Sequence, residues 1–199
     1  MQLTPEEYSI VNNSRFLLVK ADIISKVKTE FEVLQDAYSG IINSENITLP
    51  KTAAPKISRG ENYKGLPYLV LDHPAVFDKE NILAFRTMFW WGNFFSITLH
   101  LQGTYKEQYL KNITEKLLLS KPHGLYVSCN HSAWEYHYEA DNYRMVKHMA
   151  DEQITSALNQ GNFIKLSAKL ELSAYEQLQP FMKEWFGVLS GFIAPTPSP

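Results

Sequence analysis

Arg86 is the only Lys, Arg, Asp or Glu in an apolar, aromatic stretch that runs from Ile82 to Gln102. A buried guanidinium needs a partner, because an unpaired charge away from water costs several kcal/mol. It could hold an anionic ligand through two parallel hydrogen bonds, or pair with a carboxylate such as Asp72 on a neighbouring strand. A purely structural ion pair, or a guanidinium that reaches the edge of the sheet, is the simpler interpretation.

A glycine-containing segment from Ser58 to Gly65, S-R-G-E-N-Y-K-G, supplies further candidate ligand groups. Its amides and its two cations could hold a phosphate or a carboxylate. The spacing is not that of a nucleotide-binding loop, and a solvated loop is the simpler interpretation. The candidates for binding a small anion are therefore Arg86, Arg59, Lys64, Asp72 and His100.

The stretch C-N-H-S-A-W-E-Y-H-Y-E, which ends at Glu139, holds other groups with potential chemistry. His131, His137 and Glu139 are weak candidates for metal ligands, since imidazole and carboxylate suit several divalent metals. Neither H-E-x-x-H nor a paired C-x-x-C is present, so an exposed polar strand face is the simpler interpretation. Cys129 is expected to be a small buried thiol. We therefore expect no cofactor, and no residue is assigned a catalytic role.

The stretch that holds Arg86 is predicted to be a β-hairpin, because Gly92-Asn93 is typical of a two-residue turn. This turn places Arg86 opposite Leu99 on one face. The other face carries a row of aromatic side chains that we predict to be an interaction face: Phe85, Phe89, Trp91 and Phe94.

Capping residues and periodicity predict the elements that position these groups. Thr4-Pro5 begins a long N-terminal helix, interrupted near Asn12-Asn13, whose apolar stripe reaches Tyr38. We expect the stripe to pack on the protein's own sheet, although its heptad-like spacing also permits a homodimer. Capping boxes at Thr104 and Ser173 predict two later helices, and a short one is predicted over residues 151–160. Strands are predicted at 66–71, 82–91, 94–102, 125–129, 134–139 and 163–172, and residues 56–58 and 143–146 are two further short segments that could be strands.

These elements predict an α+β fold. Hairpins dominate, so we expect an antiparallel or mixed sheet of about six strands with helices packed on one face. The helices include the long N-terminal one and an amphipathic C-terminal one, kinked or split at Pro180. Residues 1–193 should form a single globular domain, and residues 194–199 a disordered Pro-rich tail.

Composition narrows the classes of function. The net charge of −2 gives no attraction to nucleic acid or to an anionic membrane. A single cysteine favours a reducing compartment, and the N-terminus resembles no secretion signal. No apolar run approaches the length of a membrane span. We therefore expect a cytoplasmic protein that has neither nucleic acid nor a membrane as its partner.

Two segments resemble a known family. Y-K-G-L-P-Y-L-V-L, from Tyr63 to Leu71, precedes the aromatic hairpin, and G-T-Y-K-E-Q-Y-L begins a helix at Gly103. In their order these segments resemble the YktB-type small bacterial proteins, a group of unknown function, over about Tyr63 to Leu118. The resemblance implies a compact α/β fold and assigns no catalytic residue. The N-terminal helix and the Trp90-Trp91 pair have no counterpart in it.

Two classes of function fit these observations. The first is a non-catalytic binding or protein-interaction module that uses the aromatic face or the 43–65 loop to receive an unidentified protein. The second is a small enzyme or binder of an anionic metabolite built around Arg86. The sequence contains no serine-hydrolase or nucleotide-binding motif, which favours the first class.

Overall fold

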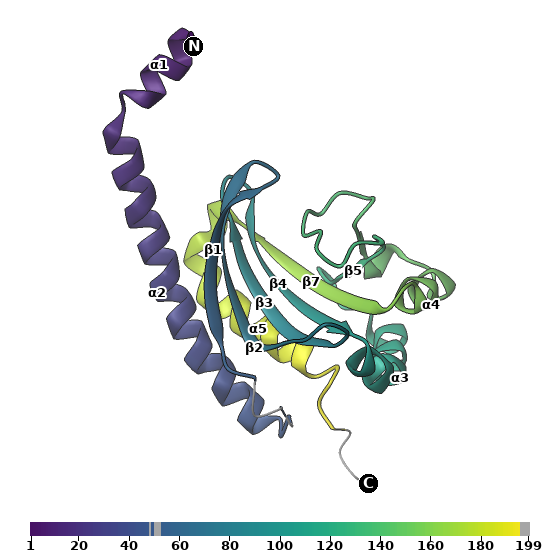
Figure 1. Cartoon of the computed structure of the whole chain (residues 1–199). Coiled ribbons are helices and arrows are strands. Elements are labelled where there is room, and N and C mark those ends of the chain that lie inside the picture. Colours follow the sequence, from purple (N-terminus) through teal and green to yellow (C-terminus); the bar gives the residue numbers. More distant parts are fainter. Residues whose placement is uncertain (48, 50–52, 196–199) are drawn as a thin grey trace.

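The computed structural model describes residues 1–47, 49 and 53–195 and confirms the predicted α+β class. Seven strands, slightly more than predicted, form one antiparallel sheet in the order β1-β2-β3-β4-β7-β5-β6 (Figure 1). The strands are β1 (Lys56–Tyr63), β2 (Leu66–Phe77), β3 (Ile82–Trp90), β4 (Phe94–Gln102), β5 (Tyr126–Ser128), β6 (Tyr143–Met145) and β7 (Phe163–Glu171). The helices are α1 (Pro5–Val11), α2 (Ser14–Ser44), α3 (Thr104–Ser120), α4 (Asp151–Asn159) and α5 (Leu178–Ser190). Two short 3-10 helices, η1 (Val146–His148) and η2 (Leu172–Gln177), complete the described elements.

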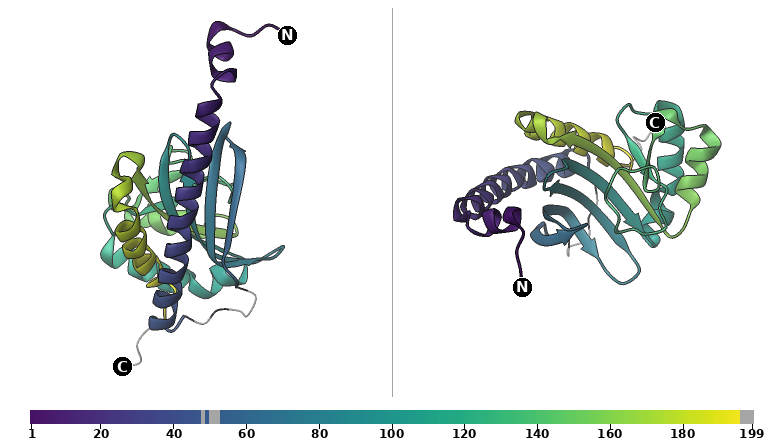
Figure 2. Two further views of the ribbon diagram at one scale, coloured as in Figure 1. Left: turned by 90° about the vertical axis from the view of Figure 1, so that its left-hand side faces the viewer. Right: turned by 90° about the horizontal axis from the view of Figure 1, so that it is seen from above.

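The predicted packing of helices on one face is confirmed. Helices α2 and α5 lie against each other and against the same face of the sheet, while α3 and α4 pack together at one end (Figure 2). Buried α2 residues recur every three or four positions: Val27, Phe31, Leu34, Tyr38 and Ile42. This spacing forms a single stripe along a helix, so α2 can cover the sheet on one side only.

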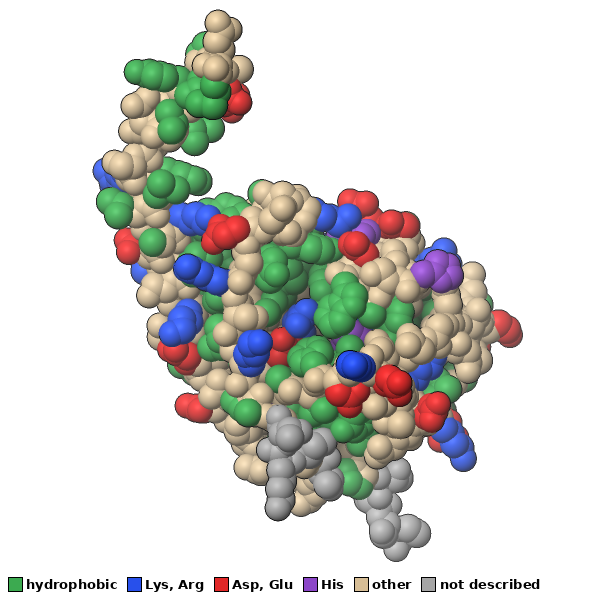
Figure 3. Space-filling view, in the orientation of Figure 1, with side chains coloured by type: hydrophobic (Ala, Val, Ile, Leu, Met, Phe, Trp, Pro, Cys, Tyr) green, Lys and Arg blue, Asp and Glu red, His purple; other side chains and the backbone are tan. Residues whose placement is uncertain are grey.

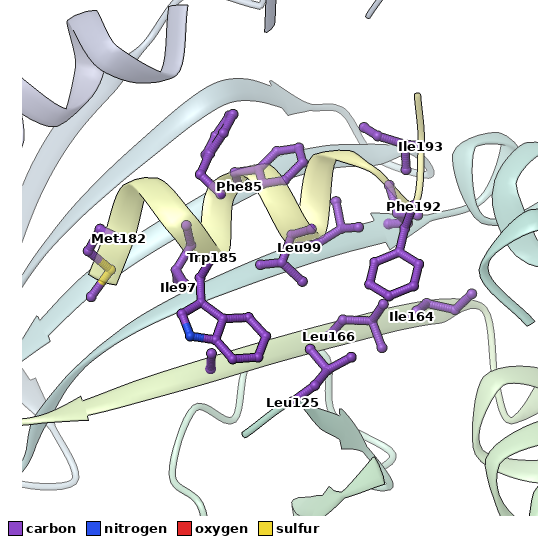
Figure 4. Packing of buried hydrophobic residues seen from close by; sticks show 14 of the residues in the cluster. Phe85, Ile97, Leu99, Leu125, Ile164, Leu166, Met182, Trp185, Phe192 and Ile193 are labelled. Carbon is purple, nitrogen blue, oxygen red and sulfur yellow. The ribbon is translucent and has the colours of Figure 1, made fainter. Parts of the chain in front are cut away.

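The main core lies between this helical layer and the sheet. Figure 4 shows Met182 and Trp185 of α5 in the same buried cluster as Ile97, Leu99 and other strand side chains. Nearby, the ring of Phe186 is 4.0 Å from that of Tyr38 and 4.5 Å from that of Phe85, centroid to centroid. Such ring pairs add about 0.5–1.5 kcal/mol each beyond the area they bury.

The predicted hairpin exists, but its predicted register is wrong by one residue. Trp90 pairs with Phe94, so three residues, Trp91, Gly92 and Asn93, form the loop, and Gly92 has a φ of 72°. A slip of one residue moves each side chain of a strand to the opposite face. Arg86 therefore lies opposite Thr98 rather than Leu99.

The second face of the sheet is covered by a loop, residues 129–142, which we call the roof loop. The strand predicted over residues 134–139 is absent there, and β5 pairs instead with β6. Side chains take the hydrogen bonds that a strand partner would have made. The Tyr63 hydroxyl accepts from the amides of Tyr136 and His137, while Lys165 Nζ donates to the carbonyls of Ala133 and Glu135. The backbone of the roof loop is thus satisfied without joining the sheet.

The N-terminal helix is interrupted where predicted. Thr4 caps α1 in a capping box with Glu7, and Asn13 caps α2 after a break at Asn12-Asn13. α1 has no buried residue, and buried residues of α2 begin only at Val27. We call residues 3–19 the arm, because Figures 1 and 2 show that they project beyond the sheet.

Three predicted boundaries are wrong. Gly103, with a φ of 61°, is the N-cap of α3, while Thr104 is already helical and bonds to Asn81 rather than forming a capping box. Residues from Ser173 onward form η2 without a side-chain cap, and Pro180 lies in the first turn of α5. Strand β2 continues to Phe77, past a bulge after Asp72.

At the predicted tail, Ala194 is still buried, and residues 196–199 lie outside the described part of the chain. The segment predicted as a loop over residues 43–65 contains the end of α2 and all of β1, and its residues 48 and 50–52 also lie outside the described part. None of the helices in the described ranges is both long enough and apolar enough to cross a membrane.

Candidate functional site

Arg86 lies on the roof-loop face of the sheet and pairs with Asp72, its direct neighbour on β2. Its Nε and Nη2 atoms each donate to one carboxylate oxygen of Asp72 at 2.8 Å. Its Nη1 atom donates to the Tyr136 hydroxyl of the roof loop at 2.7 Å. Burial opposes the charge of Arg86, but the hydrogen bonds and electrostatic interactions with Asp72 and Tyr136 together outweigh burial, so the pKa of Arg86 lies above its ordinary value.

The carboxylate partner predicted for Arg86 is therefore present, and all three of its nitrogens are engaged. The Asp72 side chain is 5 % exposed and that of Arg86 is 17 % exposed. Aromatic rings enclose the guanidinium, with ring centroids of Phe77, Trp134 and Tyr136 at 5.7, 5.9 and 5.2 Å from its central carbon. This arrangement holds the roof loop on the sheet and leaves little of Arg86 for an external anion.

Lys165 is a second buried cation on this face, and the sequence analysis did not single it out. It is fully buried, and its Nζ atom lies 4.5 Å from the ring centroid of Tyr136. Burial, helped by the charge of Arg86 and opposed by Glu135, lowers the pKa of Lys165 to about 7. An amine with such a pKa is a candidate nucleophile. Here, however, Nζ donates to two roof-loop carbonyls and no solvent reaches it, so its role in this structure is to fasten the loop.

The other predicted anion-binding residues do not converge on Arg86. His100 shares its face and is buried, and burial together with the charges of Lys165 and Arg86 lowers the pKa of His100 to about 3. Lys64 lies at the end of the β1–β2 hairpin, with Nζ 3.7 Å from Glu135. Arg59 is exposed and pairs with Leu69, whose side chain lies in the core on the helical side of the sheet. His100 is thus a neutral neighbour of the pair, and Arg59 is on the opposite face.

The predicted metal-ligand residues separate in a similar way. His131 contacts the Gln160 side chain near the end of α4. His137 and Glu139 instead group with Asp141, a residue that the sequence analysis did not consider. Asp and Asn are common in turns, so an Asp in a predicted turn, such as Asp141, does not stand out in the sequence as a metal ligand.

An apolar groove opens on the helical side of the sheet, at the tip of the β3–β4 hairpin. It has a volume of about 850 Å³. Its apolar lining comes from α2, the hairpin, η2 and the start of α5: Ile23, Val27, Phe89, Trp91, Phe95, Leu172, Tyr175 and Leu178. Lys26, Glu30 and Glu176 supply its charged groups. A pocket of this size and polarity is typical of a binding site rather than of a packing defect.

The four predicted interaction-face residues are placed in three different environments. Phe89 and Trp91 line the groove. Phe85 is buried beneath α5, against Phe186. Phe94 lies on the roof-loop face, where its ring contacts Tyr138. The one-residue register error explains why Phe94 was predicted on the wrong face, whereas Phe85, Phe89 and Trp91 share the helical side of the sheet.

Eight of the sixteen exposed large hydrophobic side chains in the described part of the chain lie on the arm. Seven of its large side chains are between 44 % and 67 % exposed: Tyr8, Ile10, Val11, Phe16, Leu17, Leu18 and Val19. Figure 3 shows hydrophobic side chains gathered on the projecting N-terminal helix. Monomeric proteins rarely expose contiguous apolar surface of this extent unless it binds something.

Comparison with models of known protein families, with curated proteins and with solved structures finds no match. The resemblance to YktB-type proteins therefore stays a prediction.

Proposed function

We propose that this protein is a non-catalytic protein-interaction module whose apolar groove receives an amphipathic helix, and that the occupant is the arm of a second copy. One observation carries the proposal: the exposed arm and the apolar groove lie along the same helix, α2. Two copies related by a twofold axis can then each place an arm in the groove of the other. Such an isologous pairing closes on itself and uses no further surface.

The apolar side chains of the arm and those of the groove lie on the same side of α2. Phe16 and Val19 lie on the side of α2 that also carries Ile23 and Val27, because these positions repeat at close to 3.6 residues per turn. The groove is therefore continuous with the apolar surface of the arm. Docking an amphipathic helix into an apolar groove is a recurrent mode of recognition. Each large side chain that becomes fully buried contributes about 1.5–3 kcal/mol.

Charges on the same side of α2 favour a partner that is a copy of this helix. Apart from Lys20, which pairs with Glu61 within the chain, their order is Arg15, Asp22, Lys26 and Glu30, so the sign alternates along the helix. An identical helix that runs in the opposite direction presents the reverse order, which brings Arg15 near Glu30 and Asp22 near Lys26. Among the described residues, none of the four forms an ion pair within the chain.

The charge of the arm argues against a membrane as the occupant. Helices that bind membrane surfaces carry several lysines or arginines on their polar face. Glu6 and Glu7 begin the arm, and Arg15 is its only Lys or Arg. The arm therefore lacks the cationic face that would attract anionic lipid.

Analytical ultracentrifugation of the full chain tests the proposal. We expect wild type to sediment as a dimer of the 22.9 kDa chain in the micromolar range. Phe16→Glu, on the groove side of the arm, should shift the protein to monomer. Leu18→Glu is the matched control, because Leu18 is at least as exposed but points to another side of α2. A wild type that remains monomeric at high concentration would refute the proposal, as would a dimer that Phe16→Glu leaves unchanged.

Charge exchange tests the antiparallel arrangement. Arg15→Glu and Glu30→Arg should each weaken the dimer, and the double variant should restore it. Exposed ion pairs contribute about 0.2–1 kcal/mol each, and the twofold axis makes two of them, so each single variant should weaken association by about 2- to 30-fold. Failure of the double variant to recover affinity would exclude this pairing of the two helices.

The second candidate from the sequence, a binder or enzyme for an anionic metabolite, has less support. It requires Arg86 to meet an external anion, whereas Asp72 and Tyr136 occupy all three guanidinium nitrogens.

A further inference from the structure

His137, Glu139 and Asp141 gather three ligand atoms within 4.8 Å of one another on the roof loop. The two carboxylates are exposed, whereas the His137 side chain is only 5 % exposed. A surface group of acidic residues is common in proteins. A buried imidazole directed into such a group is not, because a buried polar nitrogen normally has a hydrogen-bond partner.

The two ring nitrogens of His137 have different surroundings. Nε2 lies 3.3 Å from the Glu135 carboxylate, which also accepts from the Tyr63 hydroxyl at 3.0 Å. Nδ1 is buried and has no hydrogen-bond partner, and it lies 3.8 Å from a carboxylate oxygen of Asp141. A carboxylate beside one ring nitrogen, with the other nitrogen directed at further ligands, is the usual arrangement around a metal-binding histidine.

The backbone holds these ligands in place. The Asn142 side-chain amide donates to the His137 carbonyl, and the Glu139 carbonyl accepts from the amides of Asn142 and Tyr143. Asn142 is itself fully buried. The tight turn therefore fixes the spacing of the three ligands, and only the two exposed carboxylates need to adjust.

We propose that His137 Nδ1, Glu139 and Asp141 bind a divalent transition-metal ion such as Zn²⁺, with water completing its coordination and Glu135 orienting the imidazole. Zinc bonds of about 2.0–2.2 Å in tetrahedral geometry separate ligand atoms by about 3.4 Å. Small rotations of the exposed carboxylates bring the present separations to that value. One imidazole with two carboxylates favours a metal of this class over Mg²⁺ or Ca²⁺, which prefer oxygen ligands alone.

The site would act on the roof loop rather than on a substrate. It joins the backbone at residue 137 to that at residue 141, and the adjacent Tyr136 contacts Arg86. A bound ion stabilises the conformation that carries its ligands, by an amount that grows with the ratio of metal concentration to dissociation constant. Metal binding should therefore reduce opening of the roof loop from the sheet, independently of whether the arm dimerises.

Calorimetric titration of the chelator-treated full chain with Zn²⁺ tests this proposal. We expect saturable binding of one ion per chain. Asp141→Asn and Glu139→Gln lie on the surface and should not impair folding, yet each should weaken binding by more than about tenfold. Glu135→Gln, which changes the group that orients the imidazole but none of the three proposed ligands, should weaken it by about 10–100-fold.

His131→Asn is the matched control, because His131 also lies on the roof loop but outside the group. It should leave the affinity unchanged. Long-range proton–nitrogen NMR should show that Zn²⁺ shifts the Nδ1 resonance of His137 in wild type. Three results would overturn the proposal: absence of saturable binding, equal binding by Asp141→Asn and wild type, or loss of binding in His131→Asn.

Discussion

The pair formed by Arg86 and Asp72 makes a quantitative prediction. Arg86→Met retains most of the apolar stem of the side chain but removes the charge, which leaves Asp72 as a carboxylate that is 5 % exposed and has no cation. Removing one partner from a buried ion pair costs about 3–5 kcal/mol. For a chain of this length, each kcal/mol lowers the melting temperature by about 2–4 °C, so we expect a loss of about 6–20 °C.

The double variant Asp72→Leu, Arg86→Met separates the cost of the orphaned charge from the net contribution of the pair. Because a buried pair replaced by apolar residues of similar size is often neutral, the double variant should regain at least half of the lost stability. Urea unfolding followed by tryptophan fluorescence measures all four members of the cycle. Arg59→Met is the control, since Arg59 is exposed on the same sheet, and it should cost less than about 0.5 kcal/mol.

Two results would refute this reasoning. If Arg86→Met lowers the free energy of unfolding by less than about 1 kcal/mol, the ion pair does not stabilise the fold as its geometry indicates. If the double variant is less stable than both Asp72→Leu and Arg86→Met, each charge stabilises the fold independently of the pairing between them. A third result would support ligand binding by Arg86 instead: a small anion that raises the melting temperature of wild type but not that of Arg86→Met.

Two further predictions concern Lys165 and Gly103. The pKa of Lys165 is about 7 in the folded protein, whereas its ordinary value is 10.5. Between these two pH values Lys165 is protonated in the unfolded chain but neutral in the folded protein. The free energy of unfolding should therefore rise with pH, by at most about 1.4 kcal/mol per pH unit. Urea unfolding from about pH 7 to pH 9.5, below the titration of the buried tyrosines, should show this rise in wild type but not in Lys165→Met; equal slopes would contradict the assignment. Gly103→Ala should lower stability by more than about 2 kcal/mol, because Gly103 has a φ of 61° and an added Cβ would lie 2.4 Å from the Glu80 carbonyl oxygen. Gly161→Ala, at a φ of 63° but in open space, is its control, and equal losses in both would exclude the steric cause.

Local sequence signals predicted much of the fold. The break at Asn12-Asn13, the stripe along α2 and strand β7 all follow from caps and periodicity within single elements. The partner of Arg86 could also be predicted, because a charge in an apolar strand requires a counter-charge nearby and Asp72 is in the preceding strand.

The register of the β3–β4 hairpin could not be predicted in the same way. Turn residues suggested two loop positions where the structure uses three. The hydrophobic pattern normally corrects such an error, because the wrong register exposes apolar residues. Both faces of this hairpin are buried, one under helices and the other under the roof loop, so either register appeared acceptable. The predicted aromatic interaction face depended on that register.

The roof loop was missed because its cause is distant in sequence. Residues 134–139 alternate like a strand, yet Lys165 from β7 and Tyr63 from β1 satisfy their backbone groups. Nothing local distinguishes a segment held by long-range side chains from one held by a neighbouring strand. The same limitation hid Asp141, whose proximity to His137 depends on the turn that the roof loop makes.

The two covers of the sheet are stabilised by different interactions, and this difference separates the two proposals. The helical cover is apolar, so its stability and the affinity of its groove should change little with pH or with metal ions. The roof loop covers a smaller cluster of aromatic and apolar side chains and is also held by Arg86, Lys165 and Tyr63 through polar contacts. Protonation and metal binding act directly on contacts of this kind. A change in pH or zinc should therefore alter hydrogen exchange in residues 129–142 while leaving the dimer intact, and coupled changes in both would show that the two faces act as one unit.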